Sequence, residues 1–152
     1  MYKRILLPLD GSRRAEIILP HVASLAEKYG AEVILLQVVC PPLMLERDEV
    51  VDSARDRSDR QARRRSGLAY LEGVARQFEN PAGVSTLCVE ANSVVEAIFD
   101  AANRKKADLV AMASHGWGGS VRTFYGSVAS GVINKADQPL LIVRSRSFPE
   151  PD

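Results

Sequence analysis

Glycines cluster after an apolar run in the second half of the chain. The run at residues 109–112 is short, continuous and bounded, which is typical of a buried strand in a parallel sheet. Gly116, Gly118 and Gly119 follow, and Gly126-Ser127 then opens a helical pattern. Glycines let backbone amides approach a ligand, and the first amides of a helix lack internal partners and carry partial positive charge. This order of strand, glycine loop and helix is suited to binding phosphate or another anion.

Polar side chains in this stretch would add to such a site. Ser114, Ser120, Thr123 and Ser127 offer hydroxyl donors, and His115 and Arg122 offer positive charge. A structural alternative is that the glycines only form a loop and that Ser127 only caps the helix. The stretch alone leaves both interpretations open. It contains neither the P-loop pattern GxxxxGK[ST] nor the dinucleotide pattern GxGxxG.

Composition indicates an ordinary globular chain. The 152 residues are 46% hydrophobic and 26% charged, enough for one domain with a sizeable core. We predict this domain over residues 1–145, followed by a short polar tail at 146–152. The net charge of +1 gives no pull toward nucleic acid or an anionic membrane. No apolar run approaches the roughly 20 residues that span a bilayer, and the start is too short for a signal peptide. We therefore expect a cytoplasmic protein with no membrane partner.

Strand and helix patterns alternate along the whole chain. Strands are expected at residues 4–9, 32–40, 84–89, 108–112 and 140–143, and helices at 13–29, from near 51 or later to 78, at 93–106 and at 127–136. Such alternation predicts an α/β fold, a doubly wound five-stranded parallel sheet with helices on both faces.

Single residues refine these elements. Pro20 lies inside the first helical pattern and should bend that helix or cost it a hydrogen bond. Ser93 and Glu96 have the spacing of a capping box, so a helix should begin there. Cys40 and Cys88 lie in or beside strands, and we expect both to be small buried hydrophobes rather than a disulfide or a metal pair.

Arginines are concentrated at residues 55–65, where six of eleven positions are Arg and two are Asp. One interpretation is a patch for nucleic acid or an acidic partner. We favour the solvated face of a helix, because Asp56 and Asp59 interleave with the arginines and suggest local pairing. On this interpretation the chain has no nucleic-acid partner.

Two loops would meet if the first and fourth strands are neighbours where the strand order reverses. They are the turn Asp10-Gly11-Ser12 and the loop around Gly116. A carboxylate beside a phosphate cradle would suit a nucleotide. Other α/β sites fit poorly: the first turn is not the Ser/Thr-rich loop of a flavodoxin, and the acidic and lysine positions of a receiver domain are missing. No GxSxG elbow and no cluster with metal-ligand spacing occurs.

The sequence resembles the universal stress protein family from residue 2 to about 144. The resemblance rests on residues 5–12 (ILLPLDGS), residues 33–39 (VILLQVV), the glycine loop and residues 139–143 (PLLIV). Nucleotide-binding members carry Gly, two residues, Gly, nine residues, then Gly-Ser or Gly-Thr. Gly116 and Gly126-Ser127 match, and Ala113 replaces the first glycine. We expect Ala113 to keep strand-like backbone angles, in which a methyl group is harmless.

The resemblance implies the strand order 3-2-1-4-5 of a Rossmann-like fold, and ATP bound across the two loops, with Mg²⁺ or Mn²⁺ as candidate companions. It also implies a homodimer through the last strand, Leu140 to Val143, whose apolar edge would otherwise be exposed. Carried over by position, the implied nucleotide-binding residues are Pro8, Asp10 and Val38 around adenine, Ala113 by the ribose, Gly116, Gly126, Ser127 and Val128 at the phosphates, and Ser114 and His115 in the same loop.

The function expected from this resemblance is an ATP-binding regulator of the stress response. Hydrolysis should be slow at most, because no general base, arginine finger or acidic cluster for Mg²⁺ is evident beside the loop, and we assign no catalytic residues. Three alternatives remain open. They are a signalling or interaction module that binds no nucleotide, a member that binds cyclic AMP, and an ATPase or phosphotransferase that uses Asp10.

Overall fold

The computed structural model describes residues 1–41, 53–116 and 126–145. In the helix that begins at Ser53, side chains are described from residue 56 onward. Five parallel strands form one sheet in the order β3-β2-β1-β4-β5, as the resemblance implies. The strands are β1 (Arg4–Pro8), β2 (Glu32–Val39), β3 (Val84–Glu90), β4 (Leu109–Ala113) and β5 (Leu140–Val143). The predicted loop positions 117–125, among them Ser120, Arg122 and Thr123, and the predicted tail at 146–152 lie outside the described residues.

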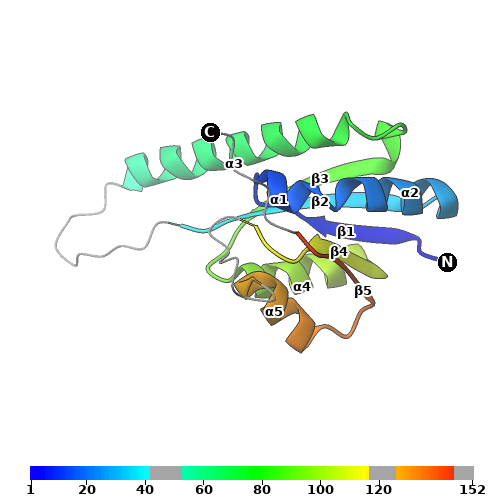
Figure 1. Ribbon diagram of the computed structural model, residues 1–152. Coiled ribbons are helices and arrows are strands. Elements are labelled where there is room, and N and C mark those ends of the chain that lie inside the picture. Colours follow the sequence, from blue (N-terminus) through cyan, green and yellow to red (C-terminus); the bar gives the residue numbers. More distant parts are fainter. Residues whose placement is uncertain (42–52, 117–125, 146–152) are drawn as a thin grey trace, which may run out of the picture.

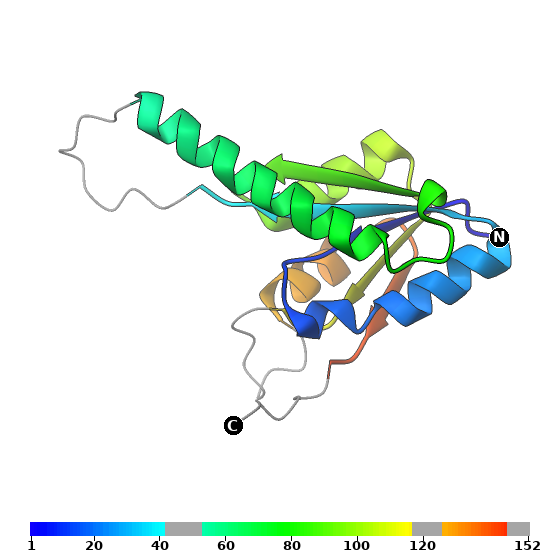
Figure 2. The ribbon, with the colours of Figure 1, turned by 90° about the horizontal axis from the view of Figure 1, so that it is seen from above.

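Helices cover both faces of the sheet, as Figures 1 and 2 show. One face carries α1 (Arg13–Glu16), α2 (Leu19–Tyr29) and α3 (Ser53–Ala75), and the other carries α4 (Val94–Lys105) and α5 (Ser127–Lys135). A short 3-10 turn, η1 (Pro81–Gly83), leads into β3. The described helices include none that is both long and apolar enough to cross a lipid bilayer. The predicted doubly wound α/β architecture is confirmed.

Side chains of each strand alternate between two apolar cores. Ile5 and Leu7 of β1 pack with α2 and α3, whereas Leu6 packs with α4 and α5. This alternation follows from the two-residue period of a strand. All three side chains are fully buried, which explains why the central strands read as continuous apolar runs.

The single helix predicted over residues 13–29 is wrong, because the structure divides it. The helix α1 ends at Glu16, and α2 begins at Leu19 with Pro20 in its first turn. Proline has no amide hydrogen, and inside a continuous helix its ring would clash with the carbonyl four residues earlier, that of Glu16. A new helix start removes both problems, because the first turn needs no amide donor.

Other local predictions divide between right and wrong. Ser93 caps α4 as expected: its hydroxyl accepts a hydrogen bond of 3.3 Å from the amide of Glu96. Both cysteines are free thiols, and Cys88 is buried. Cys40 is exposed, so its predicted burial is wrong; it follows the last residue of β2, where the sheet has ended.

Candidate functional site

The strand order reverses between β1 and β4. β1 pairs with β2 on one side and with β4 on the other, and all these pairings are parallel. The carboxyl ends of β1 and β4 therefore lie side by side. From there the chain turns toward one helical layer after β1 and toward the other layer after β4. In doubly wound sheets ligands bind at these strand ends.

Asp10 and Ser12 hold a tight turn after β1. The Oδ1 atom of Asp10 accepts hydrogen bonds from the Ser12 amide at 2.9 Å and from the Ser12 hydroxyl at 2.6 Å. The Ser12 oxygen in turn accepts from the Ala15 amide at 3.1 Å and caps α1. Gly11 between them has a φ of +86°, which only glycine adopts without strain. One carboxylate oxygen is thus fixed by the turn, and the residue remains exposed.

Gly116 lies directly against this carboxylate. A Cβ atom at Gly116 would be 1.9 Å from Oδ2 of Asp10 and 2.9 Å from its Cγ. The backbone angle of Gly116 is not among the positive φ values, so glycine is needed here for close approach and not for conformation. The turn after β1 and the loop after β4 therefore meet, as the sequence predicted from their places at the ends of two neighbouring strands.

The loop ends where α5 begins. The Gly126 amide donates to the Ser114 carbonyl at 2.8 Å, which closes the loop at its base. Gly126 is the N-cap in an extended conformation and Ser127 is the first helical residue, with no side-chain cap hydrogen bond. The alternative that Ser127 caps the helix is therefore wrong. Since α5 begins at Ser127, the amides of Ser127, Val128 and Ala129 have no partner within the helix and carry its positive dipole end.

A buried serine network fixes the first part of the loop. Ser114 is fully buried, and its amide donates to the Val143 carbonyl at 2.9 Å. Its Oγ accepts from the Ser145 amide at 3.1 Å and lies 3.2 Å from the Ser145 Oγ and 3.0 Å from Nδ1 of His115. His115 is also buried. The Ser114 hydroxyl thus ties the glycine loop to the end of β5.

The remaining predicted site residues lie at the ends of three strands. Ala113 is the last residue of β4 and is buried. Among the described non-glycine residues only Lys106 has a positive φ, so the prediction that Ala113 keeps strand-like angles is confirmed. Pro8 ends β1 and Val38 lies near the end of β2, both half-buried. By the alternation of their strands both face the α4 side of the sheet.

Tyr70 of α3 is a neighbour of the site that the sequence did not reveal. Its hydroxyl donates to Oε1 of Glu16 in α1 at 2.8 Å. Burial, then the hydrogen bond to Glu16, and also the charge of Asp10 raise the pKa of the Tyr70 phenol, against a lowering contact from the Gly11 amide. Tyr70 of α3 therefore fixes α1, the helix that directly follows the turn of Asp10. Tyr70 precedes Val74 by four residues and packs against the same core. Its contact with Glu16 joins two helices, so the periodicity of α3 gave no signal for that contact.

Comparisons with known proteins agree on one family. The family model described as "Universal stress protein family" matches residues 1–144. The universal stress protein MJ0577 of Methanocaldococcus jannaschii is 26% identical, over 97% of this chain and 98% of its own length. A universal stress protein of Thermus aquaticus is 30% identical, over 95% of this chain and all of its own.

Solved structures show the same fold. The structure of MJ0577 superposes with a TM-score of 0.83 and 29% identity, covering 97% of this chain and 99% of the other. A universal stress protein in complex with cAMP superposes with a TM-score of 0.67 and 19% identity, covering 95% and 98%.

Proposed function

Because the chain belongs to the universal stress protein family, we propose that it binds an adenine nucleotide, ATP, where the turn after β1 meets the glycine loop after β4. The observation that carries the proposal is the approach of Gly116 to Asp10, where no Cβ atom fits. Such an approach leaves backbone amides and a carboxylate side by side at the edge of the sheet where ligands bind.

The phosphates would lie against the start of α5. The amides of Ser127 and Val128 are helix-start donors, and the dipole of α5 favours negative charge there. Gly116 and Gly126 let the backbone come close without a side chain. Ser114 and His115 act through the position they give the loop, since their side chains are buried in the network with Ser145.

The base would lie on the other side of the carboxylate. Pro8 and Val38 offer half-buried apolar surface on one side of the sheet, which suits a flat adenine ring. The carboxylate of Asp10 can accept a hydrogen bond from a base or ribose donor, and Ala113 closes β4 beside it. The cAMP complex of another family member supports an adenine base.

The role we assign is regulatory. Among the residues that the structure describes, no three of His, Cys, Asp and Glu gather in a way that could hold a metal ion. A Mg²⁺ or Mn²⁺ ion would then be held mainly by the phosphates themselves. We assign no arginine and no acidic cluster to stabilise the charge of the transition state, so ATP hydrolysis should be slow. The bound nucleotide would then act by ordering the glycine loop.

The same proposal includes a homodimer through β5. Leu140, Leu141, Ile142 and Val143 are all apolar and only partly buried at the edge of the sheet. An apolar edge strand is prone to pair with another strand, and pairing with its own copy across a two-fold axis covers it.

Native mass spectrometry of the freshly purified protein, followed by calorimetric titration, tests the proposal. We expect a co-purified adenine nucleotide, or binding of ATP at micromolar concentration, with ADP and cAMP as comparisons and GTP as the control for the base. Equal binding of GTP would contradict the adenine pocket. No binding of any of the four would remove the proposal and favour an interaction module that binds no nucleotide.

A further inference from the structure

A pocket lies at the edge strand β3, away from the reversal of strand order between β1 and β4. Its volume is about 640 Å³, within the roughly 300–1,000 Å³ of small-molecule sites. Its lining includes Cys88 and Val89 of β3 and Val39 at the end of β2. Residues of α3 reach it from one face of the sheet and Arg104 of α4 from the other, so the pocket lies around the outer edge of β3. Its lining residues include none of the proposed nucleotide-binding residues, and the loops around Asp10 and Gly116 follow β1 and β4.

Arginines dominate the walls of this pocket. Arg57, Arg60 and Arg64 come from α3 and Arg104 from α4, against one carboxylate, that of Glu90. Spacings of three and four residues place the three α3 arginines on one face of the helix. Four guanidinium groups from two helices thus line one pocket with a single carboxylate, that of Glu90, so the charge of the lining is positive.

Pairing leaves two of these arginines available. Arg60 bonds Asp56 at 2.6 Å, as the predicted local pairing requires, and its Nε lies 3.6 Å from Oε1 of Glu90. Arg64 and Arg104 make no ion pair with any residue that the structure describes. Burial raises the pKa of the Cys88 thiol and the charge of Arg64 lowers it in part, and both residues line the pocket.

The half of α3 that carries the arginines precedes Gly67, the position where the helix packs closely against the sheet. A Cβ atom at Gly67 would be 2.7 Å from the Cys88 sulfur, so α3 touches the sheet there. Residues 56–66, which precede Gly67, include no large apolar side chain. Figure 2 shows this half of α3 extending past the tip of β3. Hydrophobic burial therefore does not account for the arginines on this half of the helix.

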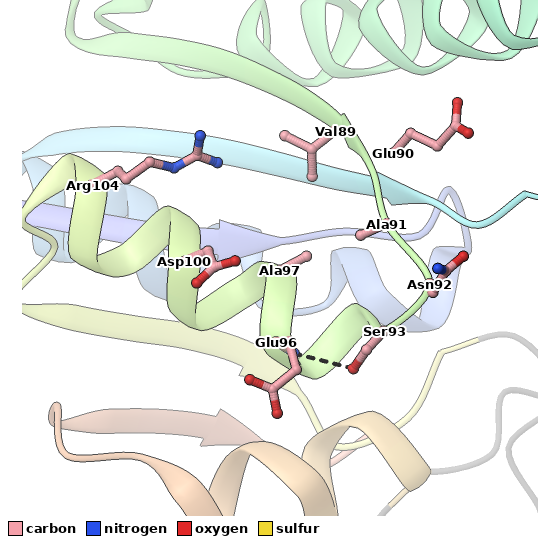
Figure 3. Close-up of a pocket in the computed structure, with 9 residues that line it drawn as sticks. All are labelled: Val89, Glu90, Ala91, Asn92, Ser93, Glu96, Ala97, Asp100 and Arg104. Atoms are coloured by element: carbon pink, nitrogen blue, oxygen red, sulfur yellow. Dashed lines mark hydrogen bonds between the residues drawn. The ribbon is translucent and has the colours of Figure 1, made fainter.

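A neighbouring smaller pocket defines where the positive region ends. It has a volume of about 250 Å³ and shares Val89, Glu90 and Arg104 with the larger one. Figure 3 shows that its further lining includes the acidic side chains of Glu96 and Asp100 on α4. These carboxylates disfavour an anion there and favour the larger pocket, where arginines outnumber the one carboxylate.

We infer that the arginine pocket, defined by Arg57, Arg60, Arg64 and Arg104 over β3, binds a small phosphorylated metabolite with two or more negative charges. Guanidinium groups pair with phosphate through two parallel hydrogen bonds, and arginines from two helices can hold two phosphate groups. The pocket is bounded by both helices and the chain carries a net charge of only +1, which favours a compact anion over a nucleic-acid strand. This site is separate from the proposed ATP site.

Amide NMR of the ¹⁵N-labelled full chain, titrated with pyrophosphate, tests the inference because each site has its own signals. We expect saturable shifts at the amides of Cys88, Val89 and Glu90. The double variant Arg64→Gln/Arg104→Gln should weaken pyrophosphate binding at least about tenfold, since each arginine contributes charge-assisted hydrogen bonds. The matched control is Arg65→Gln/Arg76→Gln, which removes the same charge from exposed positions outside the pocket. It should change affinity less than about twofold.

Three results would overturn the inference. Shifts confined to residues 113–116 and 126–128 would mean that pyrophosphate binds only the ATP site. Equal weakening in both double variants would indicate diffuse charge attraction in place of a site. Tighter binding of a single-stranded oligonucleotide than of pyrophosphate, with shifts spread along α3, would replace the metabolite with a nucleic acid. Failure to bind ATP would leave the inference intact.

Discussion

Replacing Gly116 with alanine probes the contact on which the proposed site depends. The new methyl carbon would lie 1.9 Å from Oδ2 of Asp10, whereas ordinary contact begins at 3.4 Å. The carboxylate or the loop must therefore move by about 1.5 Å, the difference between these distances. Asp10 cannot swing freely, because its other oxygen accepts the two hydrogen bonds from Ser12 at 2.9 and 2.6 Å.

The expected magnitude follows from one charge-assisted hydrogen bond. A displaced carboxylate loses either a bond from Ser12 or its proposed bond to the nucleotide, and such bonds contribute roughly 1.5–3 kcal/mol. ATP affinity should fall roughly tenfold to a hundredfold, at about 1.4 kcal/mol for each factor of ten. Isothermal titration calorimetry with ATP measures this, and thermal unfolding of the variant checks that the chain still folds.

Gly73→Ala is the matched control for this substitution. Gly73 lies within α3, and the nearest atom to its added Cβ would be Nη2 of Arg76 at 4.0 Å. Alanine in a helix interior is more stable than glycine by roughly 0.5–1 kcal/mol, so unfolding should shift upward while ATP affinity stays within about twofold. A folded Gly116→Ala variant with the ATP affinity of the wild type would show that the contact between Gly116 and Asp10 does not contribute to ATP binding.

Four further predictions concern other parts of the structure. Ala113→Gly should change ATP affinity less than about twofold by calorimetry, because the residue already has strand angles, and a tenfold gain would contradict this. Ser93→Ala should lower the free energy of unfolding in urea by about 1 kcal/mol, since it removes the cap of α4; an unchanged value would show that the cap contributes nothing. Because burial and Glu16 raise the pKa of Tyr70, the unfolded chain loses this proton first above about pH 10, and stability falls as pH rises. The free energy of urea unfolding should fall less between about pH 9 and pH 11 in Tyr70→Phe than in the wild type. Equal falls in the two proteins would contradict this role of Tyr70. Ile142→Lys should convert a dimeric wild type to a monomer in light scattering, whereas a monomeric wild type at micromolar concentration would end the proposed dimer.

Much of the fold could be predicted because its signals are local. The strands β1, β2 and β4 read as apolar runs since both of their faces are covered by helices. The cap at Ser93 could be predicted because the first amides of a helix lack partners and a serine hydroxyl just before the helix can accept from one of them. Pro20 was also visible, but the sequence did not tell whether the helix would bend or divide. That choice depends on how α1 and α2 pack on the sheet.

The candidate site was predictable only in part. The meeting of Asp10 with Gly116 could be inferred, because it follows from two strand ends at one reversal of strand order. The contact of Tyr70 with Glu16 joins residues 54 positions apart on different helices, and no periodic pattern encodes it. The arginine pocket was equally hidden: the run at residues 55–65 indicated a solvated face, and its Asp56–Arg60 pair is present. The addition of Arg104 from α4 depends on tertiary structure.

Amide NMR of the ¹⁵N-labelled protein titrated with ATP tests whether the nucleotide binds where the turn after β1 meets the loop after β4. We expect saturable shifts at Asp10 and Ser12, at Ala113 to Gly116 and at Gly126 to Val128, with Cys88 to Glu90 much less affected. These amides belong to the two loops that meet between β1 and β4. Absence of shifts at saturating ATP, or shifts confined to β3 and α3, would contradict it.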